Sequence, residues 1–358
     1  MAYRFEPGEP LGDELRRALV EQLRRASDDL ARPTPDPEGD PDANPARATG
    51  PDDESVHTAR KRIKKARSLL RLGRADLGKA TVSHAQAELR AAADRLAPQR
   101  EADAAVESAR WLLDVARRSE ADGHVQADEP AVLVAAAAAL VAATERDVDQ
   151  RRAAGAALTW AGARTVARTL EQTADWLAGR PSRADGWDAI GPGLRRQYER
   201  GGEAQRGLPA EPSVEELHEW RKRVKDLGYH ERVLRRAWPS VQRPLLDAAN
   251  ELADLLGLDH DLGLLLARID PSDQADQADD PVSHLSADDR RALRALVVGE
   301  RARLEGEARR IGRRLYAERP GAWTRRHRAW WSAAAAEVEA VAAAETETER
   351  EPARPDPG

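Results

Sequence analysis

The 358-residue chain has no cysteine, one methionine and one phenylalanine, and its aromatic residues amount to only 4%. Without cysteine it can form neither disulfides nor thiolate metal sites, and a cytoplasmic location is the default expectation. The apolar residues are mostly Ala, Leu and Val, a composition that favours helices. The scarcity of thiols and aromatics therefore points to a helical protein without a cysteine-based metal centre.

Long hydrophobic runs are also missing. The longest apolar stretch, Pro130 to Ala143, is dominated by Ala and falls short of the roughly 20 residues that a membrane-spanning helix needs. The segment Met1 to Pro7 has no apolar core of signal-peptide length. We therefore expect a soluble protein with no membrane partner.

Lysine is scarce, and its placement is uneven. Of 57 basic residues only six are Lys. The formal net charge of −6 argues against a generally basic nucleic-acid coat but allows a focused basic patch. Five of the six lysines lie in two short segments, at Lys61, Lys64, Lys65, Lys222 and Lys225.

The two segments repeat one pattern. His57 to Lys64 and His218 to Lys225 both read His-x-x-Arg-Lys-Arg-(Ile/Val)-Lys, and their starts are 161 positions apart. At 100° per residue each copy places its basic residues on one arc and its apolar residues on another. The pattern predicts two motif helices, each with one buried face and a stripe of cations that starts at a histidine.

A run of charge is usually a solvated helix face, which is the simplest alternative here. Two observations favour a functional anion site instead. No acidic residue occurs from His57 to Arg74, so no i,i+4 ion pairs balance the first stripe, and the pattern recurs with its histidine in register. The residues expected to contact an anion are His57, Arg60, Lys61, Lys64, Arg67, Arg71, His218, Arg221, Lys222 and Lys225.

Helical spacing continues along most of the chain, and no segment is typical of a strand. Asp52 and the Ser213–Glu216 capping box predict where the motif helices begin. We predict an all-α protein whose residues 1–343 form two four-helix-bundle-like halves, about 8–155 and 156–343, related by a pseudo-two-fold internal repeat. Other helices are expected at 11–31, 76–97, 101–118, 129–152, 157–178, 241–257, 259–268, 286–318 and 320–343.

Two stretches lack helical spacing. Residues 32–51 are rich in Pro, Asp and Gly and predict a flexible insert, and residues 344–358 predict a disordered charged tail. The tail carries alternating glutamates at Glu345, Glu347 and Glu349, a pattern similar to that of triphosphate tunnel enzymes. That chemistry needs strands with carboxylates on one face, so we interpret the run as solvated charge.

The motif helices resemble the CHAD family, the conserved histidine α-helical domain, over roughly residues 8–343. Segments 96–101 and 255–261 are also similar to the family's Leu-Gly-x-x-Arg-Asp turn, although His260 replaces its Arg and Gly228 stands where the second motif usually has Arg. The resemblance implies two four-helix bundles lining a basic central surface that binds inorganic polyphosphate without catalysis or cofactor. It adds Lys65, Tyr229, Arg100 and His260 to the expected contacts.

Polyphosphate presents a line of charged oxygens and no bases, so a row of Arg and Lys donors at helix-turn spacing suits it. The motif histidines have two open roles. A nearby phosphate would favour the imidazolium, and binding would then strengthen below about pH 6.5; alternatively each histidine is an interior residue that orients its neighbours. Tyr229 is likewise either a donor to phosphate or a residue at the core edge.

Other functions have weaker support. His218 and His230 fall on different helix faces, so their spacing does not predict a metal site. The sequence shows no nucleotide-binding glycine loop or nucleophile elbow, which argues against an enzyme. Nucleic-acid binding through backbone phosphates is the main alternative, and a scaffold for an acidic protein is another. Polyphosphate binding would also be compatible with a location on polyphosphate granules.

Overall fold

The computed structural model of the protein describes residues 3–31, 51–96, 98–121, 130–153, 158–269 and 285–350. All regular secondary structure in these ranges is helical, which confirms the predicted all-α class. In chain order the helices are α1 (Leu11–Ala31), α2 (Asp53–Leu72), α3 (Arg74–Leu77), α4 (Lys79–Arg95), α5 (Pro98–Ala121), α6 (Pro130–Ala153), α7 (Trp160–Ala178), η2 (Gly186–Ala189), α8 (Gly191–Arg206), α9 (Val214–Leu234), α10 (Pro239–Ile269), α11 (Ala287–Leu315) and α12 (Pro320–Arg350).

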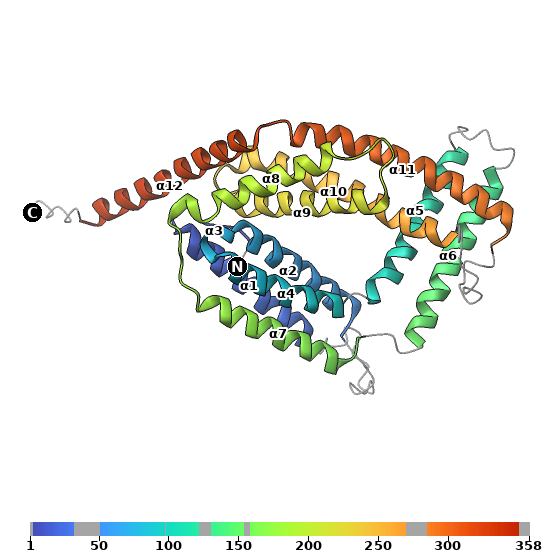
Figure 1. Ribbon diagram of the computed structural model, residues 1–358, viewed down its shortest axis with the longest axis horizontal. Helices are drawn as coiled ribbons and strands as arrows, with labels where there is room; N and C mark the ends of the chain where they lie inside the picture. The colour runs from blue at the N-terminus through green and yellow to red at the C-terminus, as the bar shows by residue number, and fades with distance from the viewer. Residues whose placement is uncertain are drawn as a thin grey trace, which may run out of the picture.

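Four helices of the N-terminal part form a bundle. α1 packs against α2 and α7, and α4 packs against the same two helices (Figure 1). Leucines at helical spacing on α1, including Leu15, Leu19 and Leu23, are completely buried and meet Ile63 and Leu70 of α2. Burial of this apolar face stabilises α2 in place and leaves its opposite, basic face outside the bundle.

The same buried core continues into α8, α9, the first half of α10, the end of α11 and the start of α12. Trp220 of α9 and Trp323 of α12 are among its largest buried side chains, and the Trp323 ring stacks on Tyr198 of α8 at a centroid distance of 4.3 Å. Because one core joins both groups of helices, the two motif helices α2 and α9 are held in a fixed relation.

A second core lies at the end of the molecule away from the C-terminus (Figure 1). α5 and α6 pack against each other, α5 also against α10, and α6 against α11. The core between them contains Leu112, Leu140, Leu262 and Leu293. α6 contributes several small buried residues to this core, including Ala136, Ala137 and Ala143.

The helices are not grouped as a division into residues 8–155 and 156–343 would group them. α7 packs on α1 and α4 although it follows residue 155, whereas α5 and α6 pack on α10 and α11. Helical periodicity identifies the buried face of α5 or α7 but not the helix that covers it, so the sequence could not distinguish these arrangements.

One predicted helix break is wrong. The expected helices 241–257 and 259–268 are a single helix, α10 (Pro239–Ile269). Gly257 lowers helix propensity, yet buried leucines lie on both sides of it, at Leu252 and Leu256 in the first core and at Leu262 and Leu265 in the second. Burial in two successive cores outweighs the local cost of the glycine.

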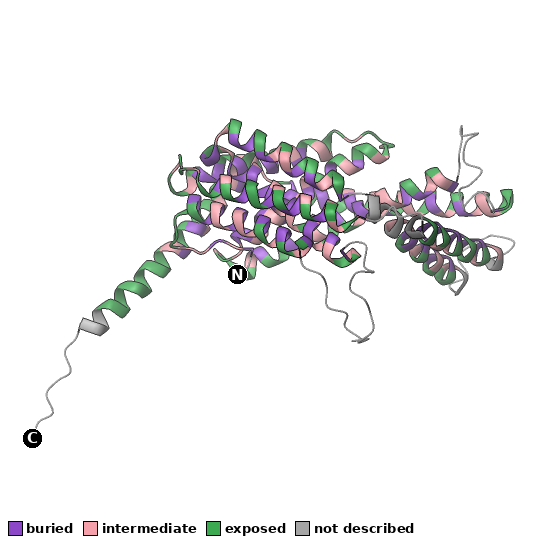
Figure 2. Ribbon diagram, turned by 90° about the horizontal axis from the view of Figure 1, so that it is seen from below, coloured by how far each residue is buried: buried purple, intermediate pink, exposed green. Residues whose placement is uncertain are grey.

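The predicted tail boundary is also wrong. α12 continues through residues 345–350, which were expected to be disordered, and Thr346 donates a hydrogen bond to the carbonyl of Ala342 at 2.9 Å. The Ala- and Glu-rich sequence favours this continuation. Figure 2 shows the last described turns exposed and projecting from the body. Residues 32–50 of the predicted insert and residues 351–358 lie outside the described ranges.

One glycine lets α8 approach α2. A Cβ atom at Gly193 would lie only 1.8 Å from the backbone oxygen of Leu72, so no larger residue fits without moving a helix. This contact places α8 against the C-terminal end of α2. α2 therefore lies between α1 and α4 of its own bundle and the helices α8 and α9.

Candidate functional site: the crossing of α2 and α9

The two motif helices begin at the predicted caps. The Asp52 carboxylate accepts a hydrogen bond from the Ser55 amide at 2.7 Å. Ser213 and Glu216 form a complete capping box, with the Glu216 side chain 2.8 Å from the Ser213 amide. Caps of this kind satisfy the first free amides of a helix and therefore fix where His57 enters α2.

α2 and α9 contact each other in their C-terminal halves. The hydroxyl of Ser68 lies 3.1 Å from Nε2 of His230, and both side chains are buried. Next to this contact, Nη2 of Arg71 lies 2.5 Å from Oδ1 of Asp226, whose side chain is only 3% exposed. Arg71, an expected anion contact, thus forms an ion pair that joins the motif helices. No local pattern in the sequence marks Asp226 or His230 as its neighbours.

The stripe residues differ in exposure. On α2, His57, Lys61 and Lys64 are exposed. On α9, Lys222 is exposed, whereas His218, Arg221 and Lys225 are half-buried. The N-terminal turns of α2 therefore offer the more accessible cations.

Cations from the two helices lie within Coulomb range of one another. Burial, together with repulsion from neighbouring cations that include Arg232 of α9 and Lys61, lowers the pKa of Lys65 to about 8. Burial also lowers the pKa of Lys225, and among the charges that act on it Lys61 of α2 is again one that lowers its pKa. Like charges that affect each other in this way form one positive surface. We call Lys61, Lys65, Lys225 and Arg232 the basic cluster.

The two stripes are not equally free of acidic neighbours. Lys222 pairs with Glu219, and Lys225 lies 3.2 Å from Asp254. Both acids are exposed, so these ion pairs contribute little to stability and can exchange for a phosphate. They nevertheless reduce the positive potential along α9, and α2 should carry more of the interaction with an anion.

Two stripe arginines connect their helices to a helix that follows in the chain. Arg60 donates to the carbonyl of Leu96, at the end of α4, and Arg221 donates to the carbonyl of Ala253 in α10 at 3.3 Å. The Arg221 guanidinium also lies against Gly257, where an added Cβ would approach it to 2.6 Å. These contacts orient each guanidinium and engage part of its donors.

Arg67 and Tyr229 lie at the edge of the core. Nε of Arg67 donates to the Gln86 side chain of α4 at 3.2 Å, and burial lowers the pKa of Arg67. Tyr229 packs edge-on against Tyr3 at 6.3 Å, and burial raises its pKa to about 12. Tyr229 is thus partly buried against the core.

His218 and His260 are brought together. Their ring centroids are 4.2 Å apart, and the Nδ1 atoms of both are buried without a hydrogen-bond partner. Burial, together with repulsion from His260, lowers the pKa of His218 to about 4. His218 is therefore neutral at pH 6.5 and does not supply a positive charge that would strengthen binding just below that pH. The Arg100 side chain lies outside the described part of the chain.

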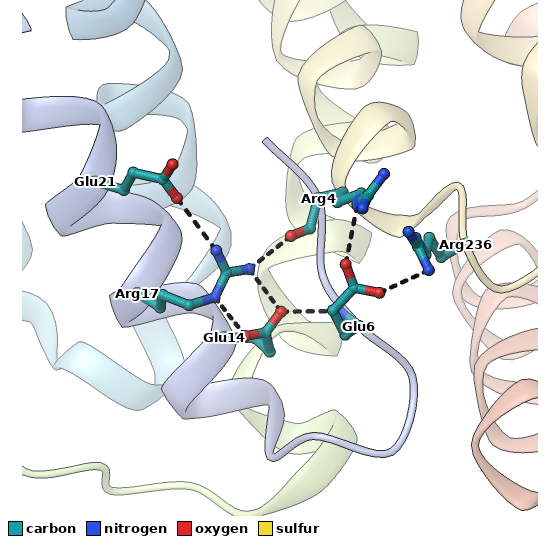
Figure 3. Close-up of polar contacts among 6 residues, drawn as sticks. All are labelled: Arg4, Glu6, Glu14, Arg17, Glu21 and Arg236. Carbon is teal, nitrogen blue, oxygen red and sulfur yellow. Dashed lines mark hydrogen bonds and ion pairs between the residues drawn. The ribbon is translucent and has the colours of Figure 1, made fainter. Parts of the chain in front are cut away.

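The N-terminal segment braces the same region, which the sequence analysis missed. The Tyr3 hydroxyl donates to the Lys65 carbonyl at 3.4 Å, and Lys65 Nζ lies 5.1 Å from the Tyr3 ring centroid. A network of ion pairs and hydrogen bonds fixes the segment to α1 and to the residues before α10 (Figure 3). Its members are Arg4, Glu6, Glu14, Arg17, Glu21 and Arg236. No local sequence signal predicts such contacts.

The pKa of Lys65 leads to a pH prediction. The ammonium is charged below about pH 8 and loses its proton above it, so affinity for a polyanion should fall as the pH rises from 7 to 9. In the Lys65→Arg protein the side chain stays charged over this range, so the fall in affinity that deprotonation of Lys65 causes between pH 7 and 9 should disappear. Binding titrations of both proteins at several pH values check the prediction; parallel profiles would contradict it.

Within the described residues, no three His, Asp or Glu side chains are grouped closely enough to hold a metal ion. No helix there is long and apolar enough to cross a membrane. Trp220 is fully buried, whereas Trp111, Trp160 and Trp176 are partly exposed.

Comparisons with known proteins agree with this architecture. The crystal structure of the CHAD domain from Ricinus communis is 14% identical, covers 88% of this chain and 95% of its own, and superposes with a TM-score of 0.50. PptA from Streptomyces chartreusis is 15% identical, covers 87% and 100%, and also has a TM-score of 0.50. At these identities the likeness shows a shared fold. No curated protein matches the sequence. The CHAD domain family model matches residues 42–270, which include both motif helices, and the chain therefore belongs to the CHAD domain family.

Proposed function

We propose that the protein binds inorganic polyphosphate without catalysis and that the exposed turns of α2 and α9 form the binding surface. The observation that carries the proposal is the basic cluster, in which Lys61 of α2 lowers the pKa of Lys225 of α9 as well as that of Lys65. A row of cations that repel one another is stabilised by a ligand with closely spaced negative charges.

The site supports a polymer of phosphate better than a ligand with bases to be read. Its donors are Lys and Arg side chains on two helix faces, and the large aromatic of α9, Trp220, is buried in the core. Backbone phosphates of a nucleic acid would contact the same cations, so nucleic-acid binding is the competing function. Recruitment to polyphosphate granules would follow from the same surface.

The proposal is tested by titrating long-chain polyphosphate at increasing salt, with single-stranded nucleic acid of equal charge as competitor. Release of counterions from about four contacts predicts a slope of about −3 in the logarithm of affinity against the logarithm of salt concentration. We expect the nucleic acid to compete weakly. Equal competition would favour the nucleic-acid function, and no binding at low salt would contradict both.

A further inference from the structure

An open pocket of about 930 Å³ lies between α8 and α12, away from the basic cluster. It is lined by η2, by one face of α8 and by the first turns of α12, and no candidate residue of the motif helices contributes to it. Five of its lining residues are arginines, namely Arg195, Arg196, Arg200, Arg325 and Arg328.

None of the five arginines forms an ion pair or a hydrogen bond with a described residue. Three carboxylates, Asp188, Glu199 and Glu203, line the same pocket, yet none of them is paired with an arginine. The guanidinium donors, which match phosphate oxygens in bidentate geometry, are therefore available to a ligand.

Arg200 is the least exposed of these arginines. Burial lowers its pKa, and repulsion from Arg223 of α9 and from Arg196 lowers it further. A cation that is partly desolvated and surrounded by other cations is stabilised by an anion beside it. The part of the pocket around Arg200 therefore favours a negatively charged group.

The size and lining of the pocket indicate the kind of ligand. Its volume lies in the range of small-molecule sites and exceeds what a single phosphate needs. Five arginines against three carboxylates leave a formal charge of about +2, which a ligand with several negative charges balances. Trp187 and Pro192 add an apolar wall. We propose that the α8–α12 pocket binds a small ligand that carries two or more phosphate groups.

The test uses the Lys61→Glu/Lys64→Glu protein, in which two exposed cations of α2 are replaced and polyphosphate binding is expected to be weakened, so that its result does not depend on that binding. Inorganic triphosphate and ATP are titrated by calorimetry at low salt. We expect one molecule to bind per chain, and adding Arg325→Glu and Arg328→Glu should weaken binding at least tenfold. Both arginines are exposed, and circular dichroism checks that the helices persist.

A matched control changes the charge equally elsewhere. Arg164→Glu/Arg168→Glu alters two exposed arginines of α7, and less than a threefold loss is expected. A similar loss in both proteins, or no saturable binding of either ligand, would overturn the proposal. If the Arg325/Arg328 variant fails to fold, Arg195→Glu serves in its place.

The two ligands identify the source of the phosphates. Tighter binding of ATP than of triphosphate, with the advantage lost in Trp187→Phe, would identify a nucleotide. Equal affinities would show that the phosphate groups alone are recognised.

Discussion

Replacing both Lys61 and Lys64 by Glu is expected to weaken binding of long-chain polyphosphate about 100-fold at low salt. Each charge-assisted contact contributes roughly 1.5–3 kcal/mol, and a tenfold change in affinity corresponds to about 1.4 kcal/mol. Loss of two contacts accounts for that decrease, and repulsion by the new carboxylates adds to it. Both side chains are exposed and point away from the apolar face of α2, so the fold should persist. Calorimetric titration measures the change.

The control for this variant is Lys79→Glu/Arg164→Glu, which alters exposed cations of α4 and α7 outside the motif helices. It changes the net charge by the same amount and should retain affinity within a few-fold. If the Lys61/Lys64 variant keeps its affinity, the binding surface is not on α2. If the control loses as much, only the overall charge matters.

Replacement of Arg71 by Met is expected to lower the free energy of unfolding by about 3–5 kcal/mol. The reason is the carboxylate of Asp226, which is 3% exposed and would be left buried without its cation. Because Arg71 itself is 24% exposed, some water can reach the pair, and we expect a value near the lower end. Urea denaturation of the two proteins measures the difference.

A double-mutant cycle separates the ion pair from the packing of the arginine chain. In the Asp226→Asn background no buried charge remains, so Arg71→Met should cost much less there than in the original protein. Equal costs in both backgrounds would mean that Arg71 acts through its hydrocarbon chain and that the ion pair does not hold the motif helices together.

Local signals predicted the parts of the fold that local physics determines. Asp52 and Ser213 begin the motif helices as expected because a cap depends on residues within one turn. The buried faces were also predictable, since Val56, Ile63 and Leu70 follow helical spacing. The same spacing could not show that Arg71 would face Asp226, because that pairing depends on how α9 crosses α2.

Other features of the site result from contacts between segments that are distant in the sequence. The sequence identified His218 as a possible cation, but its ring contact with His260 and its low pKa result from burial between α9 and α10. The brace formed by Tyr3 depends on contacts 62 positions along the chain. The internal repeat stays a prediction. Arg71 of α2 pairs with Asp226 of α9, and Arg232 of α9 lowers the pKa of Lys65 of α2. A two-fold relation between the motif helices would exchange these two pairs of positions.

α10 has a consequence for how the protein folds. This single helix of 31 residues supplies Leu252 to the large core and Leu265 to the distal one. Loss of either core would expose half of α10, while the hydrogen-bonded turns of the same helix continue into the core that remains. The two cores should therefore melt as one cooperative unit, and protection of α5 and α6 amides from hydrogen exchange should follow the global stability. A fragment that ends within α10 would keep neither core complete.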